Sequence, residues 1–186
     1  MEFFHAPVRL PLNAEEMVLR KIWLLGAAMI LVVSGGIAIA EGPVDPAAVK
    51  SEDGKYLDKE GNPTFKVASD GTVDWYTYSG YRRYHSECHV CHGPDGMGSS
   101  YAPALASSLK TMSYEDFMGV VAGGRINGTS VMPALGDNPN VACYMDDLYV
   151  YLRARANDAV GRVRPARKED KPEAYAKAED SCMGKK

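Results

Sequence analysis

The sequence has no excess of positive charge and no repeated or low-complexity segment. Its 186 residues include 21 Lys and Arg against 24 Asp and Glu, which gives a formal net charge of −3. A nucleic-acid partner requires a basic footprint, so this balance excludes nucleic acid. Without repeats or biased segments there is no reason to expect a repeat array or a disordered chain, and a globular protein is the default.

Long apolar runs are also scarce, and the one that stands out lies near the N-terminus. Arg20-Lys21 precede an apolar run over residues 22–39, and Ala38-Ile39-Ala40 has the small-x-small pattern of a signal peptidase site. We predict a signal peptide over residues 1–40 and a periplasmic mature chain. The alternative is that the run remains as a membrane anchor. Residues 1–16 are either a long n-region or the product of a misread start before Met17.

Removal of residues 1–40 would leave 146 of the 186 residues, enough for one domain and too few for two. We expect a monomer with a single core. Composition divides this mature chain into a polar arm at 41–71, a central domain at 72–157 and a charged tail at 158–186. Within the arm, a turn at 58–63 between short stretches at 55–57 and 64–67 predicts a short hairpin.

The most informative motif is Cys-His-Val-Cys-His at residues 88–92. Two thiols three residues apart can bond the two vinyl groups of one porphyrin, and the adjacent imidazole then points at the iron. The spacing therefore predicts one haem c bonded covalently to Cys88 and Cys91, with His92 as an iron ligand. A Cys-x-x-Cys pair would also suit zinc or a redox dithiol, but the terminal histidine distinguishes haem attachment from both.

Haem attachment uses two of the four cysteines and leaves Cys143 and Cys182. In an oxidising compartment the economical interpretation is a disulfide between them. It would close a segment of 39 residues, staple the tail to the domain and stabilise the fold by about 3–4 kcal/mol. A zinc site with all four cysteines is the alternative, and it leaves His92 without a purpose.

Aromatic residues recur at near-helical spacing over residues 73–88 and predict a helix that leads into the haem motif. Gly80 lies inside this helix. Glycine in a helix interior costs about 1 kcal/mol relative to alanine, so its presence indicates that another helix approaches closely there. The expected partner is a late helix over residues 141–156, in which Leu148, Tyr151 and Leu152 share one face.

A third helix is predicted over residues 113–121. It would begin at Ser113, with Asp116 three residues on in an approximate capping pattern, and end at Gly123-Gly124. The loop between His92 and this helix is rich in Gly, Pro and Ser. We therefore expect an all-α fold with long loops around one flat cofactor.

These motifs resemble class I cytochromes c, over residues 73–156. In that family a glycine and an aromatic residue lie eight and four positions before the first haem cysteine, as Gly80 and Tyr84 do here. Residues 147–152 are similar to the family's C-terminal helix, which crosses the first helix at that glycine. The resemblance also implies that the carbonyl of Pro103, eleven residues after His92, accepts the other imidazole N–H and orients the ligand.

The sixth iron ligand is predicted to be Met132. It lies 40 residues after His92, and Pro133 holds it in an extended conformation unsuited to a helix. Class I cytochromes c place their methionine in such a loop, commonly before proline. Met97 is too near His92 to reach the opposite face of the haem. Met112, Met118 and Met145 flank or lie in predicted helices, and Met183 lies in the tail.

Ligation by His92 and Met132 has a functional consequence. A thioether ligand raises the reduction potential, and two filled axial positions leave no vacancy for dioxygen, peroxide or substrate. We therefore expect a one-electron carrier and not an enzyme. His85 and His89 are interpreted as helix-surface or haem-periphery residues. A haem sensor or small peroxidase, the alternative from another class, would need an open iron position.

A narrower resemblance concerns the electron partners. Trp75-Tyr76, residues 80–87, residues 93–100 and the second cysteine pair are similar to the four-cysteine, methanol-metabolism-related c-type cytochromes. The resemblance implies that a quinoprotein alcohol or methanol dehydrogenase, which holds the pyrroloquinoline quinone (PQQ), donates the electron. A downstream cytochrome or terminal oxidase would accept it. The alternative is a general periplasmic carrier with a different donor.

The docking surface is expected at the haem edge beside Cys88 and at the loop around Met132, with arginines on either side. Arginines are concentrated after the central domain. There are five of them between residues 153 and 167. They form either a solvated helix face and tail or part of that docking surface.

Overall fold

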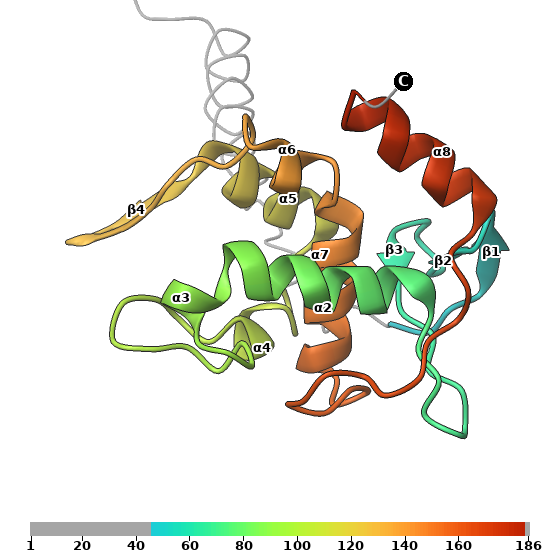
Figure 1. Ribbon diagram of the computed structural model, residues 1–186. Helices are drawn as coiled ribbons and strands as arrows, with labels where there is room; N and C mark the ends of the chain where they lie inside the picture. The colour runs from blue at the N-terminus through green and yellow to red at the C-terminus, as the bar shows by residue number, and fades with distance from the viewer. Residues whose placement is uncertain (1–45, 185–186) are drawn as a thin grey trace, which may run out of the picture. The chain divides into compact units, whose positions relative to one another are not determined.

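Helices form most of the structure, a computed structural model that describes residues 46–184 (Figure 1). In chain order the helices are α2 (Trp75–Glu87), α3 (His89–His92), α4 (Leu105–Ser108), α5 (Tyr114–Gly123), α6 (Pro139–Ala142), α7 (Met145–Ala156) and α8 (Glu173–Cys182). The predicted signal peptide and the alternative start at Met17 lie outside the described residues. Between residues 46 and 184, no helix is long and apolar enough to cross a membrane.

The helix that precedes the haem motif begins where an aspartate caps it. Asp74 accepts hydrogen bonds from the backbone N–H of Thr77 at 2.8 Å and from its hydroxyl at 2.5 Å. A capping carboxylate satisfies the unpaired N–H groups of a first helical turn, so α2 starts at Trp75. Asp74 also accepts from the backbone N–H of Lys66 at 2.8 Å, which ties the arm to the helix.

The predicted crossing of the first and late helices at Gly80 is confirmed. A Cβ atom on Gly80 would overlap the carbonyl oxygen of Asp147 and lie 2.7 Å from Cβ of Tyr151, both in α7. Only glycine allows the two backbones to approach so closely. Leu148 and Tyr151 are each 1% exposed in the contact between the helices. The crossing fixes the direction in which α2 delivers the haem motif.

The late helix differs from its prediction, because it is two helices and not one. α6 has Asn138 as its N-cap and Pro139 at its start, and α7 begins only at Met145. Tyr144 between them has φ −132° and ψ 24°, which is not helical. The third helix is confirmed as α5, with the hydroxyl of Ser113 accepting from the backbone N–H of Asp116 at 3.0 Å.

The all-α prediction is corrected by two small antiparallel sheets. One contains β1 (Lys50–Glu52), β2 (Lys55–Leu57) and β3 (Pro63–Thr64) in that order, and the other contains β4 (Arg125–Asn127) and β5 (Ser130–Met132). The predicted hairpin is present as β2 and β3, with Tyr56 opposite Thr64. β1 and the ribbon of β4 and β5 were not predicted, because three-residue strands are too short to show a periodic pattern.

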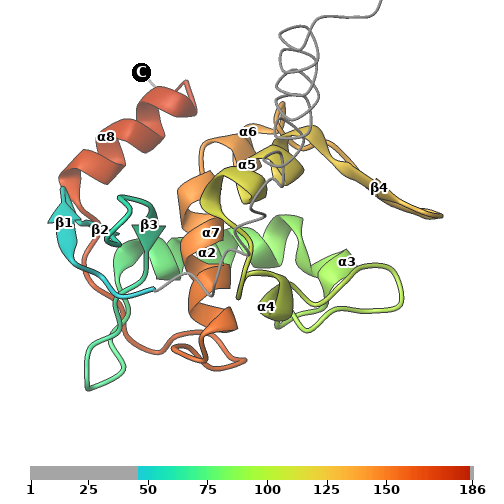
Figure 2. The ribbon, with the colours of Figure 1, turned by 180° about the vertical axis from the view of Figure 1, so that it is seen from behind.

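Among residues 46–184, the arm and the tail pack against the central helices within one compact unit (Figure 2). Arg153 of α7 donates to Asp58 of the arm at 2.8 Å, and both side chains are almost fully buried. The backbone of Val73 bonds to the carbonyl of Arg167 at 3.2 Å and to the N–H of Glu169 at 2.8 Å. The predicted boundaries of the arm at residue 71 and of the tail at residue 157 therefore mark changes in amino-acid composition only.

Helix α8, which was not predicted, is held by a buried polar group. The hydroxyl of Tyr175 donates to the carboxylate of Asp147 at 2.5 Å and lies 2.8 Å from the hydroxyl of Ser79. Burial raises the pKa of Asp147 to about 7, although the hydrogen bonds from Ser79 and Tyr175 oppose this effect. The tail is thus attached where α2 and α7 cross.

Candidate haem site

The two cysteines of the motif lie on one short helical turn at the end of α2. Cys88 caps α2, with its N–H bonded to the carbonyl of Tyr84 at 2.9 Å, and the N–H of His92 bonds to the carbonyl of Cys88 at 3.1 Å. Residues three apart on such a turn share a face. Cys88 and Cys91 are both unpaired thiols, and burial raises the pKa of Cys88 to about 12.

His92 is oriented for coordination by a backbone carbonyl. Its side chain is 7% exposed, and Nδ1 lies 3.0 Å from the carbonyl oxygen of Pro103. A carbonyl only accepts, so Nδ1 carries the proton and Nε2 keeps its lone pair. Nε2 has no hydrogen-bond partner among the described residues. This is the arrangement that a histidine ligand requires.

The loop after His92 brings Pro103 to the imidazole because its glycines let the backbone fold tightly. Gly98 has φ 86°, and a Cβ there would lie 2.8 Å from the N of Ala104 and 3.0 Å from the carbonyl carbon of Pro103. Its N–H bonds to the carbonyl of His92 at 2.9 Å. The hydroxyl of Tyr84 donates to the carbonyl of Gly93, which fixes the start of the loop to α2.

An arginine of α7 holds the same loop from its other side. Arg155 is 5% exposed and donates from Nε to the carbonyl of Asp95 at 3.1 Å and from Nη1 to the carbonyl of Val160 at 2.7 Å. Hydrogen bonds from a buried guanidinium are strong because the group is charged. Sequence reasoning missed Arg155 and Gly98, although the concentration of glycines at residues 93–98 was a usable signal for a tight loop.

Met132 ends strand β5, in the extended conformation that Pro133 predicts, but in a ribbon and not in a loop. It is half-buried and packs against the main hydrophobic core. Gly124, with φ 73°, permits close approach at the base of the ribbon, since a Cβ there would lie 2.7 Å from the carbonyl oxygen of Met132. The ribbon and α3 project on the same side of the unit in both views (Figures 1 and 2).

The other candidate methionines lie in different surroundings. Met112 and Met118 pack against the main core, and Met145 is buried in α7 at 7% exposure. Met183 packs against the smaller core around Tyr175, and Met97 is 53% exposed in the loop after His92. Packing does not separate Met112 and Met118 from Met132, which contacts the same core, so the assignment of Met132 remains a prediction from its position before Pro133.

The residues present fit a haem. Nε2 of His92 and the thiols of Cys88 and Cys91 are free, and the motif and the loop after it carry exposed apolar side chains, with Val90 at 75%, Tyr101 at 75% and Met97 at 53% exposure. Several large apolar side chains exposed together mark a surface that something apolar covers. A porphyrin is such a partner. Haem c, when bound, supplies an iron that changes between the ferric and ferrous states.

His85 and His89 are part of the periphery. Nδ1 of His85 donates to the carbonyl of Tyr81 at 2.8 Å, and its ring contacts that of Tyr81 at a tilt of 35°, with centroids 4.1 Å apart. The rings of His85 and His89 are stacked at 5.8 Å. Among residues 46–184, no group of three or more His, Cys, Asp or Glu side chains is arranged to hold a metal ion.

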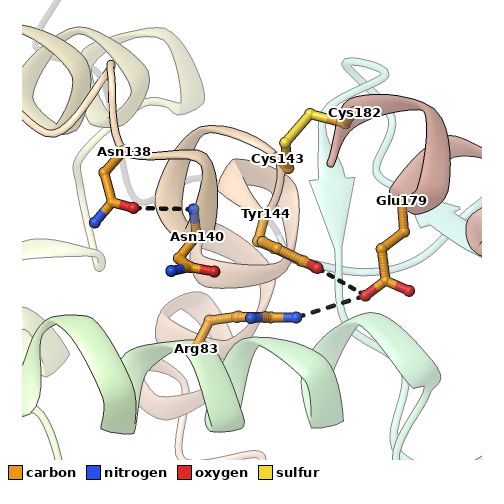
Figure 3. Close-up of a disulfide and its surroundings, with 7 residues drawn as sticks. All are labelled: Arg83, Asn138, Asn140, Cys143, Tyr144, Glu179 and Cys182. Carbon is orange, nitrogen blue, oxygen red and sulfur yellow. Dashed lines mark hydrogen bonds and ion pairs between the residues drawn. A yellow bond between two sulfur atoms is a disulfide. The ribbon is translucent and has the colours of Figure 1, made fainter. Parts of the chain in front are cut away.

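The second cysteine pair forms a disulfide between the α6–α7 junction and the end of α8 (Figure 3). This bond removes Cys143 and Cys182 from the alternative four-cysteine zinc site. Beside it, Glu179 of α8 accepts from the hydroxyl of Tyr144 at 2.8 Å and from Arg83 of α2 at 3.5 Å. The guanidinium of Arg83 also lies over the Tyr144 ring, 3.4 Å from its centroid. The end of α8 is thereby connected to α2, the helix that carries the haem motif.

Comparisons with known proteins find cytochromes. Cytochrome c-553I of Paracoccus denitrificans is 54% identical over 136 residues, which cover 71% of this chain and 60% of that protein. Cytochrome c-555 of Methylococcus capsulatus is 38% identical over 107 residues, which cover 57% of this chain and 80% of that protein. The chain thus spans less than two thirds of the length of cytochrome c-553I. No protein-family model matches the sequence.

A solved structure is also similar. The c-type cytochrome XoxG from Methylobacterium extorquens AM1 is 65% identical, with a TM-score of 0.71 and coverage of 74% of this chain and 86% of that one. The chain therefore belongs to the c-type cytochromes, which are electron-transfer proteins and carry covalently bound haem c with its iron. Within that family it is similar to XoxG, and the sequence resemblance to class I cytochromes c is confirmed.

Proposed function

We propose that this cytochrome is a periplasmic one-electron carrier with a single haem c bonded to Cys88 and Cys91 and held between His92 and Met132. The observation that carries the proposal is the hydrogen bond of His92 Nδ1 to Pro103, at 3.0 Å, which leaves Nε2 for the iron. A histidine and a thioether together fill both axial positions and raise the reduction potential. Such a site suits transfer of one electron.

The donor in this proposal is a PQQ-dependent methanol or alcohol dehydrogenase, and the acceptor is a downstream cytochrome or terminal oxidase. The support is the resemblance of residues 80–87 and 93–100, with the second cysteine pair, to methanol-metabolism-related cytochromes. Similarity to XoxG, at 65% identity, agrees with the same group. The quinone belongs to the dehydrogenase, so this chain contributes the haem, its ligands and a docking surface. A small and replaceable interface is sufficient for such an exchange.

Stopped-flow absorbance tests the donor. The oxidised holoprotein is mixed with a quinoprotein methanol dehydrogenase and methanol, and haem reduction is followed in time. Fast reduction that saturates with cytochrome concentration supports the proposal. The control omits methanol, and a second control reduces the haem with ascorbate to show that it is redox-active. Reduction by ascorbate together with slow or absent reduction by the dehydrogenase would instead indicate a general carrier with another donor.

Export is the remaining part of the proposal. Cleavage after Ala40 would give a mature chain that begins at Glu41, and the haem would then be attached outside the cytoplasm. Intact mass and N-terminal sequencing of the protein from a periplasmic extract test this. An N-terminus upstream of residue 22 in the membrane fraction would favour the anchor.

A further inference from the structure

A groove with two arginines that have no carboxylate partner among the described residues lies beside the haem motif. It has a volume of about 350 Å³ and is lined by Tyr81, Arg82, His85 and Ser86 of α2 together with Arg164 of the tail. None of these side chains is acidic. His85 precedes Cys88 by three residues, which is about 4.5 Å along a helix axis. The groove therefore adjoins the point where the haem is attached.

The two arginines differ from the others in the same part of the chain. Carboxylates pair with most of them: Glu179 with Arg83, Asp58 with Arg153, Asp95 with Arg162 and Asp70 with Arg167. Among residues 46–184, no carboxylate lies within ion-pair distance of Arg82 or Arg164. Arg164 contacts only the hydroxyl and ring of Tyr78, and both arginines are exposed.

The other polar groups in the groove present acceptors, so the donors to an anionic group come from the two arginines. Nδ1 of His85 is used by the carbonyl of Tyr81, so its Nε2 faces outward from that bond. The hydroxyl of Ser86 donates to the carbonyl of Arg83 at 3.1 Å and keeps its own lone pairs. A guanidinium presents a planar set of N–H donors that matches a carboxylate. Two such groups in a protein of net charge −3 form a local positive site on a negative background.

We propose that the groove between Arg82 and Arg164 docks a carboxylate-bearing surface of the electron-exchange partner protein. This inference rests on the proposed function, because it assumes that the partner is a protein. The partner's acidic side chains would enter the groove and pair with Arg82 and Arg164, which places the partner next to the Cys88 side of the haem. Charge complementarity of this kind accelerates association and limits docking to one face.

A binding experiment tests the groove without the dehydrogenase. ¹⁵N-labelled ferrous holoprotein is titrated with hexaglutamate at low ionic strength, and amide shifts are recorded. We expect shifts concentrated at residues 81–86 and around Arg164, and roughly tenfold weaker binding in Arg82→Gln/Arg164→Gln. The matched control Lys110→Gln/Arg167→Gln removes two exposed charges elsewhere and should bind like the wild type. Arg82→Lys/Arg164→Lys keeps the charges and should retain most of the affinity.

A kinetic experiment separates failure of the groove from failure of the proposed donor. The rate of haem reduction by the dehydrogenase is measured against ionic strength for the same variants. A lower rate and a flatter salt dependence in the Gln variant alone support the proposal. Binding at the groove without reduction of the wild type would reject the dehydrogenase as partner but keep the groove. Hexaglutamate binding that the Gln variant retains, or that the control loses equally, overturns the groove.

Discussion

Replacing Gly80 by alanine tests the helix crossing that positions the haem motif. The added methyl group would overlap the carbonyl oxygen of Asp147 and lie 2.6 Å from its carbonyl carbon and 2.7 Å from Cβ of Tyr151. These neighbours are backbone or the stem of a buried ring, so α2 and α7 must separate. Alanine gains about 1 kcal/mol of helix propensity, whereas overpacking of this kind costs about 1–3 kcal/mol or more. Because these neighbours cannot move aside, we expect a cost near the top of that range and a net loss of about 2 kcal/mol.

The matched control for this change is Gly119→Ala. Gly119 lies in the middle of α5, and a Cβ there would meet nothing within 4 Å. We therefore expect a gain of up to about 1 kcal/mol from helix propensity alone. Urea unfolding of the two holoproteins, followed by circular dichroism and haem absorbance, gives both free energies. If Gly80→Ala were as stable as Gly119→Ala, the close crossing of α2 and α7 would be refuted.

Three further changes test the tail, the ligand and the disulfide. Because burial raises the pKa of Asp147 to about 7, the folded state binds its proton more tightly than the unfolded state. The contribution of Asp147 to stability should therefore fall by roughly 3 kcal/mol from pH 4 to pH 7, and Asp147→Asn should flatten this dependence in urea titrations at each pH. Met132→Ala should lower the reduction potential by a sizeable part of the about 0.8 V that axial ligands span, and an unchanged potential and visible spectrum would reject Met132. Cys143→Ser with Cys182→Ser opens a segment of 39 residues and should lower the free energy of unfolding in denaturant by about 3–4 kcal/mol. An unchanged free energy of unfolding would mean that Tyr175, and not the disulfide, holds α8.

The sequence alone was sufficient to predict the helices whose ends and contacts depend on the chemistry of nearby residues. The spacing of the aromatic residues predicted α2, Gly80 predicted the close approach of α7, and the capping hydroxyl of Ser113 predicted the start of α5. The approach of Pro103 to His92 was implied by the family resemblance, and the structure brings these two residues within 3.0 Å. In each case the residue type has few other structural roles at its position, so the sequence alone indicates the contact.

Elements that depend on tertiary contacts were not predictable. The break before α7 occurs where Cys143 bonds to Cys182 and the ring of Tyr144 stacks on Arg83, contacts that no local pattern encodes. Helix α8 looks like a charged tail because most of its surface is polar, and only Tyr175 is buried. Such a helix is stabilised by docking and not by its own propensity.

The tail arginines show why a charge run is hard to interpret from sequence. The two predicted alternatives were a solvated face and a docking surface. In the structure both Arg153 and Arg155 are buried, at 1% and 5% exposure. Arg153 bonds to Asp58 of the arm, and Arg155 bonds to the carbonyl of Asp95 in the loop after His92. Arg162 and Arg167 pair with aspartates, which leaves Arg164 exposed without a carboxylate among the described residues. Within fifteen positions, arginine is therefore buried as a structural donor, paired with an aspartate, or exposed without a carboxylate partner.

The central claim is that His92 and Met132 close both sides of the iron so that the protein carries electrons. Mixing the ferrous holoprotein with carbon monoxide tests it most directly, with Met132→Ala as the reference for an open site. The account predicts that the wild type binds carbon monoxide slowly or not at all, whereas the variant binds it rapidly. Rapid and tight binding by the wild type would contradict the claim and indicate an iron open to ligands, as in a haem sensor or peroxidase.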